Sequence, residues 1–246
     1  RDKYKVYGEL INTYGYNLEP GSKELTALNY YTNEEITIPL DPTQTPGENA
    51  QRYFAKYNKQ KRTFEALTEL IQETADDIQY LESISNALDI ALSEADLAQI
   101  KEELMQSGYI RRKHTKKKVK LTSKPMHYIS SDGYDMYVGK NNLQNEELTF
   151  SFANGNDWWF HAKGAPGSHV IVKSGGDELP DCTFEEAGRL AAYYSKNRGA
   201  DKVEIDYIQK KHVKKPNGAK PGFVVYYTNY SLVIDSDISN IKNVQD

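Results

Sequence analysis

The sequence predicts an α+β fold: a coiled-coil-like helical hairpin joined to a mixed α+β module with a largely antiparallel sheet. Apolar residues recur at heptad spacing across residues 57–92, which indicates helices that pack along one stripe. Short apolar segments separated by turn residues follow residue 126, which indicates strands and hairpins. Charge also divides the chain, because residues 1–110 carry 10 Lys and Arg against 19 Asp and Glu, whereas residues 111–246 carry 21 against 16. A hydrophobic fraction of 38% is enough for a packed core.

The first segment, residues 1–48, is expected to hold a short helix over residues 3–16 and then a β-hairpin. Residues 25–31 and 36–40 form the two predicted strands around a polar turn, and Pro39 limits the second strand to a sheet edge. Two prolines and a glycine predict a loop over residues 41–47.

The second segment, residues 49–110, is expected to form the helical hairpin. One heptad position collects Tyr57, Phe64, Ile71, Ile78 and Leu92, and the partner position collects Leu67, Leu81 and Leu88. A second helix over residues 94–106 ends before Gly108, as helices commonly end before a glycine. The shorter helix is expected to cover part of the longer one; an intermolecular coiled coil is the alternative.

A basic linker over residues 111–125 leads into the third structural region, the α+β module of residues 126–246. Asp132-Gly133 predicts a tight turn between the first two strands. Thr183 and Glu186 match a capping box at the start of a helix. The predicted strands are residues 127–130, 134–139, 158–163, 169–173, 203–207, 223–227 and 232–235.

Both tryptophans of the chain stand side by side, between Asp157 and His161. Because neighbouring side chains of a strand point to opposite faces, we expect only one of Trp158 and Trp159 to anchor the core. The other, helped by Asp157 or His161, is expected to stack on a nucleobase or on a peptide side chain.

Basic residues gather in the same module. Most of them lie in residues 210–222, where two prolines restrict the backbone. Lysine ammonium groups bind phosphates as point charges, so these residues predict nucleic-acid binding without base-specific reading. A solvated loop that only aids solubility is the alternative. The segment contributes Lys210, Lys211, Lys214, Lys215 and Lys220, and the linker and the capped helix add Arg111, Arg112, Lys113 and Arg198.

The sequence predicts no catalytic residue, no metal site and no cofactor. His161 and His169 do not have the spacing of a closed zinc set, and Ser168 and His169, adjacent on a strand, point apart. Cys182 is the single cysteine, which excludes an intrachain disulfide and fits a reducing compartment such as the cytoplasm. The sequence contains no apolar run long enough to insert in a membrane and no signal peptide, and the missing initial methionine predicts a fragment.

Ordered motifs over residues 126–235 resemble the C-terminal RNA-binding module of the NFACT family. Residues 1–110 resemble the end of that family's N-terminal module and its helical middle, chiefly through residues 36–42 and 48–57. The resemblance adds Lys140 and Asn141 to the predicted RNA-binding set. The motifs are residues 132–133, 139–141, 145 with 148–149, 157–161, 166–170, 186–187, 191–195, 213–216 and 221–224.

The resemblance implies a bacterial ribosome-quality-control factor. Family members bind stalled large ribosomal subunits that carry peptidyl-tRNA, recruit alanyl-tRNA and support C-terminal alanine tailing, and their helical middle contacts the stalk base. The expected partners are therefore the large subunit, its rRNA and tRNA. The family's N-terminal lobe, with its principal tRNA contacts, has no counterpart in this sequence, so we do not expect the chain to perform tailing alone.

The alternative function is adhesion, because streptococcal members of the family bind fibronectin and are treated as surface adhesins without a signal peptide. The 19 tyrosines and an exposed strand edge would suit addition of an extended peptide as a further strand. In that case the protein would also reach the cell surface, and binding would depend little on the lysines.

Overall fold

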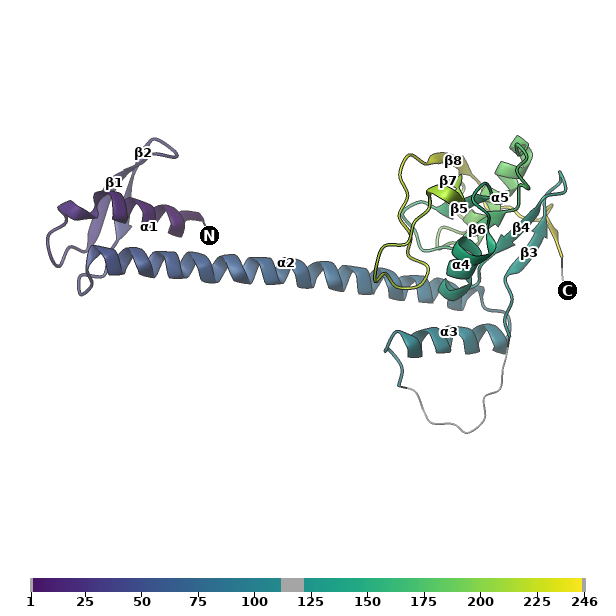
Figure 1. Ribbon diagram of the computed structural model, residues 1–246, viewed down its shortest axis with the longest axis horizontal. Coiled ribbons are helices and arrows are strands. Elements are labelled where there is room, and N and C mark those ends of the chain that lie inside the picture. Colours follow the sequence, from purple (N-terminus) through teal and green to yellow (C-terminus); the bar gives the residue numbers. More distant parts are fainter. Residues whose placement is uncertain (1, 112–121, 245–246) are drawn as a thin grey trace. The chain divides into compact units, whose positions relative to one another are not determined.

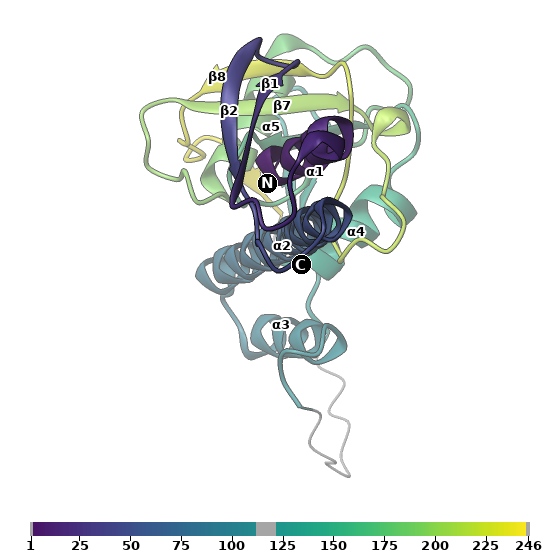
Figure 2. The same cartoon turned by 90° about the vertical axis from the view of Figure 1, so that its left-hand side faces the viewer.

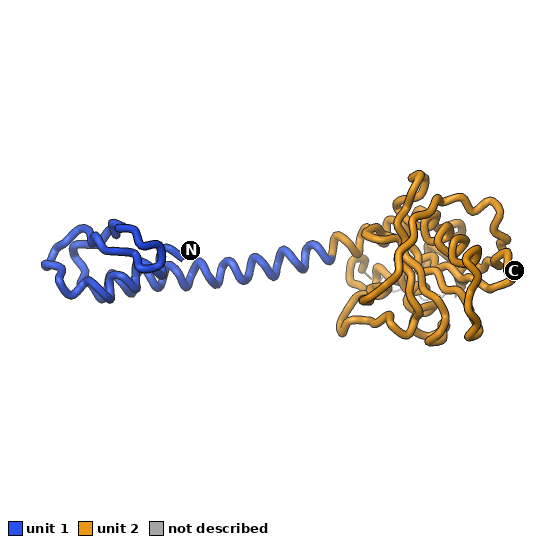
Figure 3. Tube along the Cα trace, turned by 90° about the horizontal axis from the view of Figure 1, so that it is seen from above, with its two compact units in different colours: residues 1–76 blue, residues 77–246 orange. Residues whose placement is uncertain are grey.

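The structure, a computed structural model, describes residues 2–111 and 122–244. The chain divides into two compact units, residues 1–76 and residues 77–246, coloured separately in Figure 3. The fold class is confirmed: helices and antiparallel strands combine in one α+β chain. Arg112 and Lys113 of the predicted linker lie outside the described residues.

The first unit holds the predicted short helix and β-hairpin. Helix α1 (Asp2–Tyr14) packs on strand β1 (Glu24–Asn29), which pairs antiparallel with β2 (Glu34–Pro39); Figure 2 shows this helix beside the hairpin. Alternate residues of β1 are buried, as expected for a strand with one face on a core. The core residues are Leu10, Ile11, Leu25, Ala27, Ile38, Leu40, Ala50 and Tyr53.

Helix α2 (Pro46–Ile90) begins at a proline, whose missing N–H costs nothing at the first helical position. Thr45 and Glu48 form a reciprocal cap there: Glu48 N donates to Thr45 Oγ1 at 3.2 Å, and Thr45 N donates to Glu48 Oε2 at 2.7 Å. Helix α3 (Glu94–Gln106) follows after three residues and lies along the C-terminal end of α2 (Figure 1).

The predicted apolar seam of α2 is wrong in detail. The side chains buried against Ile100 of α3 are Tyr80, Ile84 and Ala87, next to the predicted positions but not on them. Tyr80 can be buried because its hydroxyl donates to Glu103 Oε1 at 2.9 Å, a partner that a pattern of Leu and Ile does not reveal. The seam residues that stay exposed are Phe64, Leu67, Ile71, Ile78, Leu81, Leu88 and Leu92.

The second unit contains a seven-stranded sheet with the order β8-β7-β5-β6-β4-β3-β9, in which every neighbouring pair is antiparallel. Both faces of the sheet are covered by other parts of the chain, and each face contributes to its own apolar cluster. Helix α5 (Asp181–Tyr193) covers one face; α4 (Asn142–Glu147), a π-helical turn (Leu148–Phe152) and the segment around Val213–Tyr226 cover the other (Figure 1). The strands are β3 (Met126–Ile129), β4 (Asp135–Val138), β5 (Trp158–Ala162), β6 (Val170–Val172), β7 (Val203–Gln209), β8 (Tyr230–Ile234) and β9 (Lys242–Asn243).

Two local predictions fail in this unit. Helix α5 starts at Asp181 after Pro180, so Thr183 lies inside the helix and its hydroxyl donates to Asp132 at 2.8 Å instead of capping. Residues 223–227 form no strand beyond a single bridge between Lys214 and Val225, because the segment lies across the sheet face rather than at its edge. None of the described helices is both long and apolar enough to span a membrane.

Candidate nucleic-acid interface

Strand β5 lies between β7 and β6 inside the sheet and carries both tryptophans. Trp158 and Trp159 point to opposite faces, as predicted, but both faces are covered. Trp159 is fully buried, and Trp158 is half-buried against Phe184 of α5, 4.9 Å between ring centres. Neither indole is therefore a free platform on the surface, and stacking by one of them stays a prediction.

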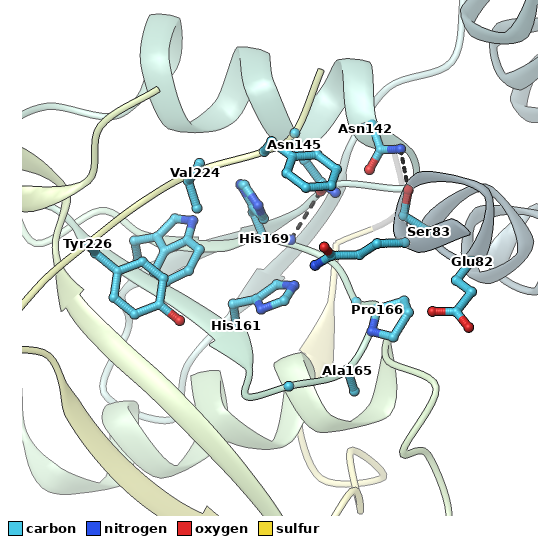
Figure 4. A pocket seen from close by; sticks show the side chains of 16 residues that line it. Glu82, Ser83, Asn142, Asn145, His161, Ala165, Pro166, His169, Val224 and Tyr226 are labelled. Carbon is cyan, nitrogen blue, oxygen red and sulfur yellow. Dashed lines mark hydrogen bonds between the residues drawn. The ribbon is translucent and has the colours of Figure 1, made fainter. Parts of the chain in front are cut away.

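On the side of the sheet to which Trp159 points, the structure contains a pocket of about 370 Å³ (Figure 4). Trp159, His161 and His169 of the sheet line it, and the segment Gly222–Tyr226 forms another wall. In Figure 4 His161, His169 and Tyr226 surround one space. Its remaining lining comes from Gln79, Glu82, Ser83, Asn142, Asn145 and residues 164–167. We call this space the Trp159 pocket.

The pocket holds its two histidines neutral. Burial lowers the pKa of His161 to about 4 and that of His169 to about 3, against 6.5 for an ordinary imidazole. The ring of His169 is fixed by Thr149, whose Oγ1 lies 2.8 Å from Nδ1. Its backbone N–H donates to Asn145 Oδ1 at 3.0 Å. The pocket thus presents uncharged polar groups at neutral pH.

Aromatic rings form much of the wall. The ring centres of Trp159 and His161 are 5.7 Å apart with planes inclined by 14°, and Tyr226 lies 5.0 Å from Trp159. Tyr226 is oriented by Asp206, because its hydroxyl donates to Oδ2 at 2.9 Å. The buried Nε1–H of Trp159 has no hydrogen-bond partner within the described part of the chain.

The lysines of residues 210–222, a segment that we call the lysine loop, fall into two groups. Lys215 Nζ lies 2.7 Å from Glu146 Oε1, and Lys220 forms an ion pair with Asp77, so both ammonium groups are already neutralised. Lys210, Lys211 and Lys214 form no ion pair with any described carboxylate. These three are the residues of the loop that are free to meet a phosphate.

Several other predicted contact residues form polar contacts within the fold. Lys173 Nζ binds the buried carboxylate of Asp157 at 2.5 Å, and Asp157 Oδ2 also accepts from Asn154 N at 2.7 Å. Asn141 is buried, caps α4 and donates to Gln99 Oε1 at 2.7 Å. RNA binding by Asp157 and Asn141 stays a prediction.

Lys140 has a structural partner of the same kind. Its Nζ lies 3.1 Å from Oδ1 of Asp96, a buried residue of α3. Burial raises the pKa of the Asp96 carboxyl, but hydrogen bonds from Ser123, from Leu92 N and from Lys140 outweigh it and bring the pKa down to about 2. The pair connects α3 to the turn between β4 and α4.

The remaining basic residues do not join the lysine loop. The guanidinium of Arg198 lies 3.6 Å from the ring centre of Tyr193, beyond the end of α5 on the other face of the sheet. Arg111 is exposed at the end of the described linker. Within the described residues, no group of three His, Cys, Asp or Glu side chains could hold a metal ion.

Sequence reasoning missed the helix that supplies the pocket's amides. Asn141, Asn142, Gln144 and Asn145 are all buried at or on α4, which was not predicted. The available signal was the run of amide residues over 141–145, which is too polar for a core and too free of charge for a surface helix. Tyr226 was assigned to a strand rather than to a pocket wall.

Comparisons with known proteins decide the family. Residues 1–123 match the family model for the NFACT N-terminal and middle domains, and residues 124–227 match the NFACT protein RNA binding domain. The chain belongs to the NFACT family. The resemblance inferred from the motifs is thereby confirmed.

The relatives agree with this assignment. The chain is 42% identical to "Rqc2 homolog RqcH" of Streptococcus pneumoniae serotype 2 over 245 residues, and 41% identical to the protein of the same name from Bacillus subtilis strain 168 over 246 residues. These matches cover 99% and 97% of the chain but 44% and 42% of the relatives, so the chain spans less than half of their length.

A solved structure shares the fold. The C-terminal part of the fibronectin/fibrinogen-binding protein from Streptococcus suis matches with a TM-score of 0.74 and 37% identity, over 98% of this chain and 88% of that one.

Proposed function

We propose that this chain is the RNA- and ribosome-binding part of a ribosome-associated quality-control factor. The supporting observation is that an NFACT RNA-binding domain carries lysines at 210, 211 and 214 that form no ion pair with a described carboxylate. Its relatives carry the name of a quality-control homologue. In this proposal the chain binds stalled large subunits with tRNA and rRNA in the cytoplasm and supports alanine tailing without itself catalysing a reaction.

The structure narrows which residues should carry the affinity. Charge reversal at Lys215 or Lys220 also breaks a partly exposed ion pair within the fold, so a loss of RNA binding would have a second explanation. Lys211 and Lys214 are exposed and pair with no described carboxylate, which makes their reversal a cleaner test. Each phosphate that the protein no longer neutralises should reduce the salt slope of log K by about 0.7 to 0.9.

The test is co-sedimentation with purified large ribosomal subunits at about 50 and about 200 mM salt. We expect the wild-type chain to bind with a steep salt dependence. The variant Lys211→Glu/Lys214→Glu should bind more weakly and show a flatter salt slope. A matched control, Lys23→Glu/Lys202→Glu, changes the net charge equally at exposed positions outside the loop and should bind as the wild type does.

Two outcomes contradict the proposal. If the loop variant and the control bind equally, the lysine loop is not the RNA-binding surface. If the wild-type chain fails to co-sediment at either salt concentration, this part of the protein does not bind the large subunit by itself.

A second candidate function, fibronectin binding, is favoured by the name of the similar Streptococcus suis protein and by one edge of the sheet. Strand β8 pairs only with β7 among the described strands, and its Tyr230 and Val233 are exposed, so its outer side is open to an added strand. In a binding assay on immobilised fibronectin, Val233→Lys should weaken binding and the double lysine variant should not. The reverse pattern would reject strand addition.

A further inference from the structure

The lining of the Trp159 pocket contains uncharged polar groups and one carboxylate, so it suits an uncharged ligand better than an anion. Both imidazoles that line it are neutral at pH 7, and the one described carboxylate in its lining, Glu82, would repel a phosphate. The amide of Asn145 uses Oδ1 for His169, while its Nδ2 donates no hydrogen bond within the described residues. The ring of His161 interacts with the backbone of Gly167 and of Ala162, and no described side chain hydrogen-bonds to it.

The same pocket is suited to a flat ring. The partly exposed rings of His161 and Tyr226 form its aromatic wall, and their ring centres lie 5.7 and 5.0 Å from that of Trp159, which is buried behind them. At about 370 Å³ it lies near the small end of the usual range for ligand pockets, roughly 300–1,000 Å³.

The free lysines lie beside the pocket rather than in it. Lys214 and Val225 exchange two backbone hydrogen bonds of 2.9 and 2.8 Å. Val224 and Tyr226, the residues on either side of Val225, line the pocket. A phosphate bound by Lys214 would therefore lie one residue pair away from the pocket wall.

The wall is held in place before any ligand arrives. Gly222 N donates to Glu146 Oε2 at 3.2 Å, and the same carboxylate binds Lys215. Gly222 has φ of +80°, and a Cβ at this position would lie 2.9 Å from Asn142 Oδ1, so the close approach requires glycine. A preformed wall reduces the entropy that binding must overcome.

We propose that the Trp159 pocket binds one unstacked nucleobase of a single-stranded RNA segment, while Lys211 and Lys214 bind the adjoining phosphates. This inference rests on the RNA binding proposed above and says which parts of the RNA the pocket and the lysines bind. Stacking on the aromatic wall accounts for tolerance of base type, and hydrogen bonds to His161 and Asn145 orient the base edge.

The test compares two fluorescently labelled oligoribonucleotides of equal length by anisotropy with the full chain. One is oligouridylate; the other carries the same ribose-phosphate backbone without bases. We expect the base-containing probe to bind roughly 5- to 150-fold more tightly. Because the pocket contribution is uncharged, this ratio should stay constant between about 50 and about 200 mM salt while both affinities fall.

Two pocket variants and one loop variant separate the contributions. His161→Phe keeps the ring and removes its hydrogen-bonding nitrogens, and Val224→Trp fills the pocket; each should reduce the ratio towards one without changing the affinity for the abasic probe. Unchanged abasic binding also shows that the variants are folded. Lys211→Glu/Lys214→Glu should weaken both probes equally.

Other results overturn the inference. If the wild-type chain binds both probes with equal affinity and the loop variant weakens both, RNA binding stands but the pocket takes no base. If the pocket variants leave the ratio unchanged, the bases stack elsewhere. If neither probe binds at the lower salt, the RNA-binding proposal fails together with the pocket.

Discussion

Replacing Asp96 by Asn should measure what joins helix α3 to the RNA-binding domain. The Asp96 carboxylate is buried, caps its own helix through Leu92 N and Ser93 N, and binds Lys140 and Ser123. Asn keeps the volume and removes the charge, so the variant resembles the protonated acid. Because the pKa falls from 3.8 to about 2 on folding, the charged form stabilises the fold by about 2 kcal/mol relative to the neutral one.

The pH dependence of the stability tests the contribution of Asp96 in a second way. A depressed pKa stabilises the folded state above the unfolded-state value, and this contribution disappears as pH falls towards 2. The stability difference between wild type and Asp96→Asn should therefore be about 2 kcal/mol at pH 7 and about half of that at pH 3.

Urea unfolding followed by tryptophan fluorescence suits the measurement, because Trp158 and Trp159 both lie in the second unit. Glu94→Gln is the matched control: it removes a charge from the same first helical turn at an exposed position, and should cost no more than about 0.5 kcal/mol. Equal effects of the two substitutions, or a difference that does not change with pH, would refute the buried ion pair as the connection.

Two further predictions concern the pocket. The pKa values of His161 and His169 are lowered by folding, so the unfolded chain binds protons at a higher pH than the folded chain does. The free energy of unfolding should therefore fall as pH drops below 6.5, by about 2 kcal/mol per histidine at pH 5. Urea midpoints of wild type and His161→Asn at pH 7 and pH 5 test this, and an equal loss of stability in both proteins between the two pH values would contradict it. A Cβ at residue 139 would lie 2.1 Å from Asn145 Oδ1, so Gly139→Ala should cost about 1 to 3 kcal/mol. Gly155→Ala, where the nearest atom is 3.6 Å away, should cost under about 0.5 kcal/mol, and equal thermal midpoints for the two variants would reject the clash.

The parts of the fold that were predictable are those specified by local pattern. The hairpin of β1 and β2, the turn at Asp132-Gly133 and the limits of α3 follow from residues within a few positions of each other. The capped helix was located correctly, but its first turn was not, because Thr183 hydrogen-bonds to Asp132, 51 residues away. Partners so distant in sequence leave no local signal.

The candidate site was predictable by region and not by geometry. The strand carrying Trp158 and Trp159 was identified, and so was the lysine segment beside it. The sequence could not show that both sheet faces are covered, which buries Trp159, or that Glu146 and Asp77 neutralise Lys215 and Lys220. The amides of α4 were missed because their value lies in tertiary contacts, such as Asn142 Nδ2 with Glu103 Oε1 at 2.9 Å.

Lys220 connects the wall of the Trp159 pocket to helix α2. Lys220 binds Asp77 on α2 and donates a hydrogen bond of 2.9 Å to the Tyr109 hydroxyl, and the pocket wall begins two residues later at Gly222. Movement of this part of α2 relative to the wall therefore requires that the ion pair with Asp77 break or that the flexible Lys220 side chain change its conformation.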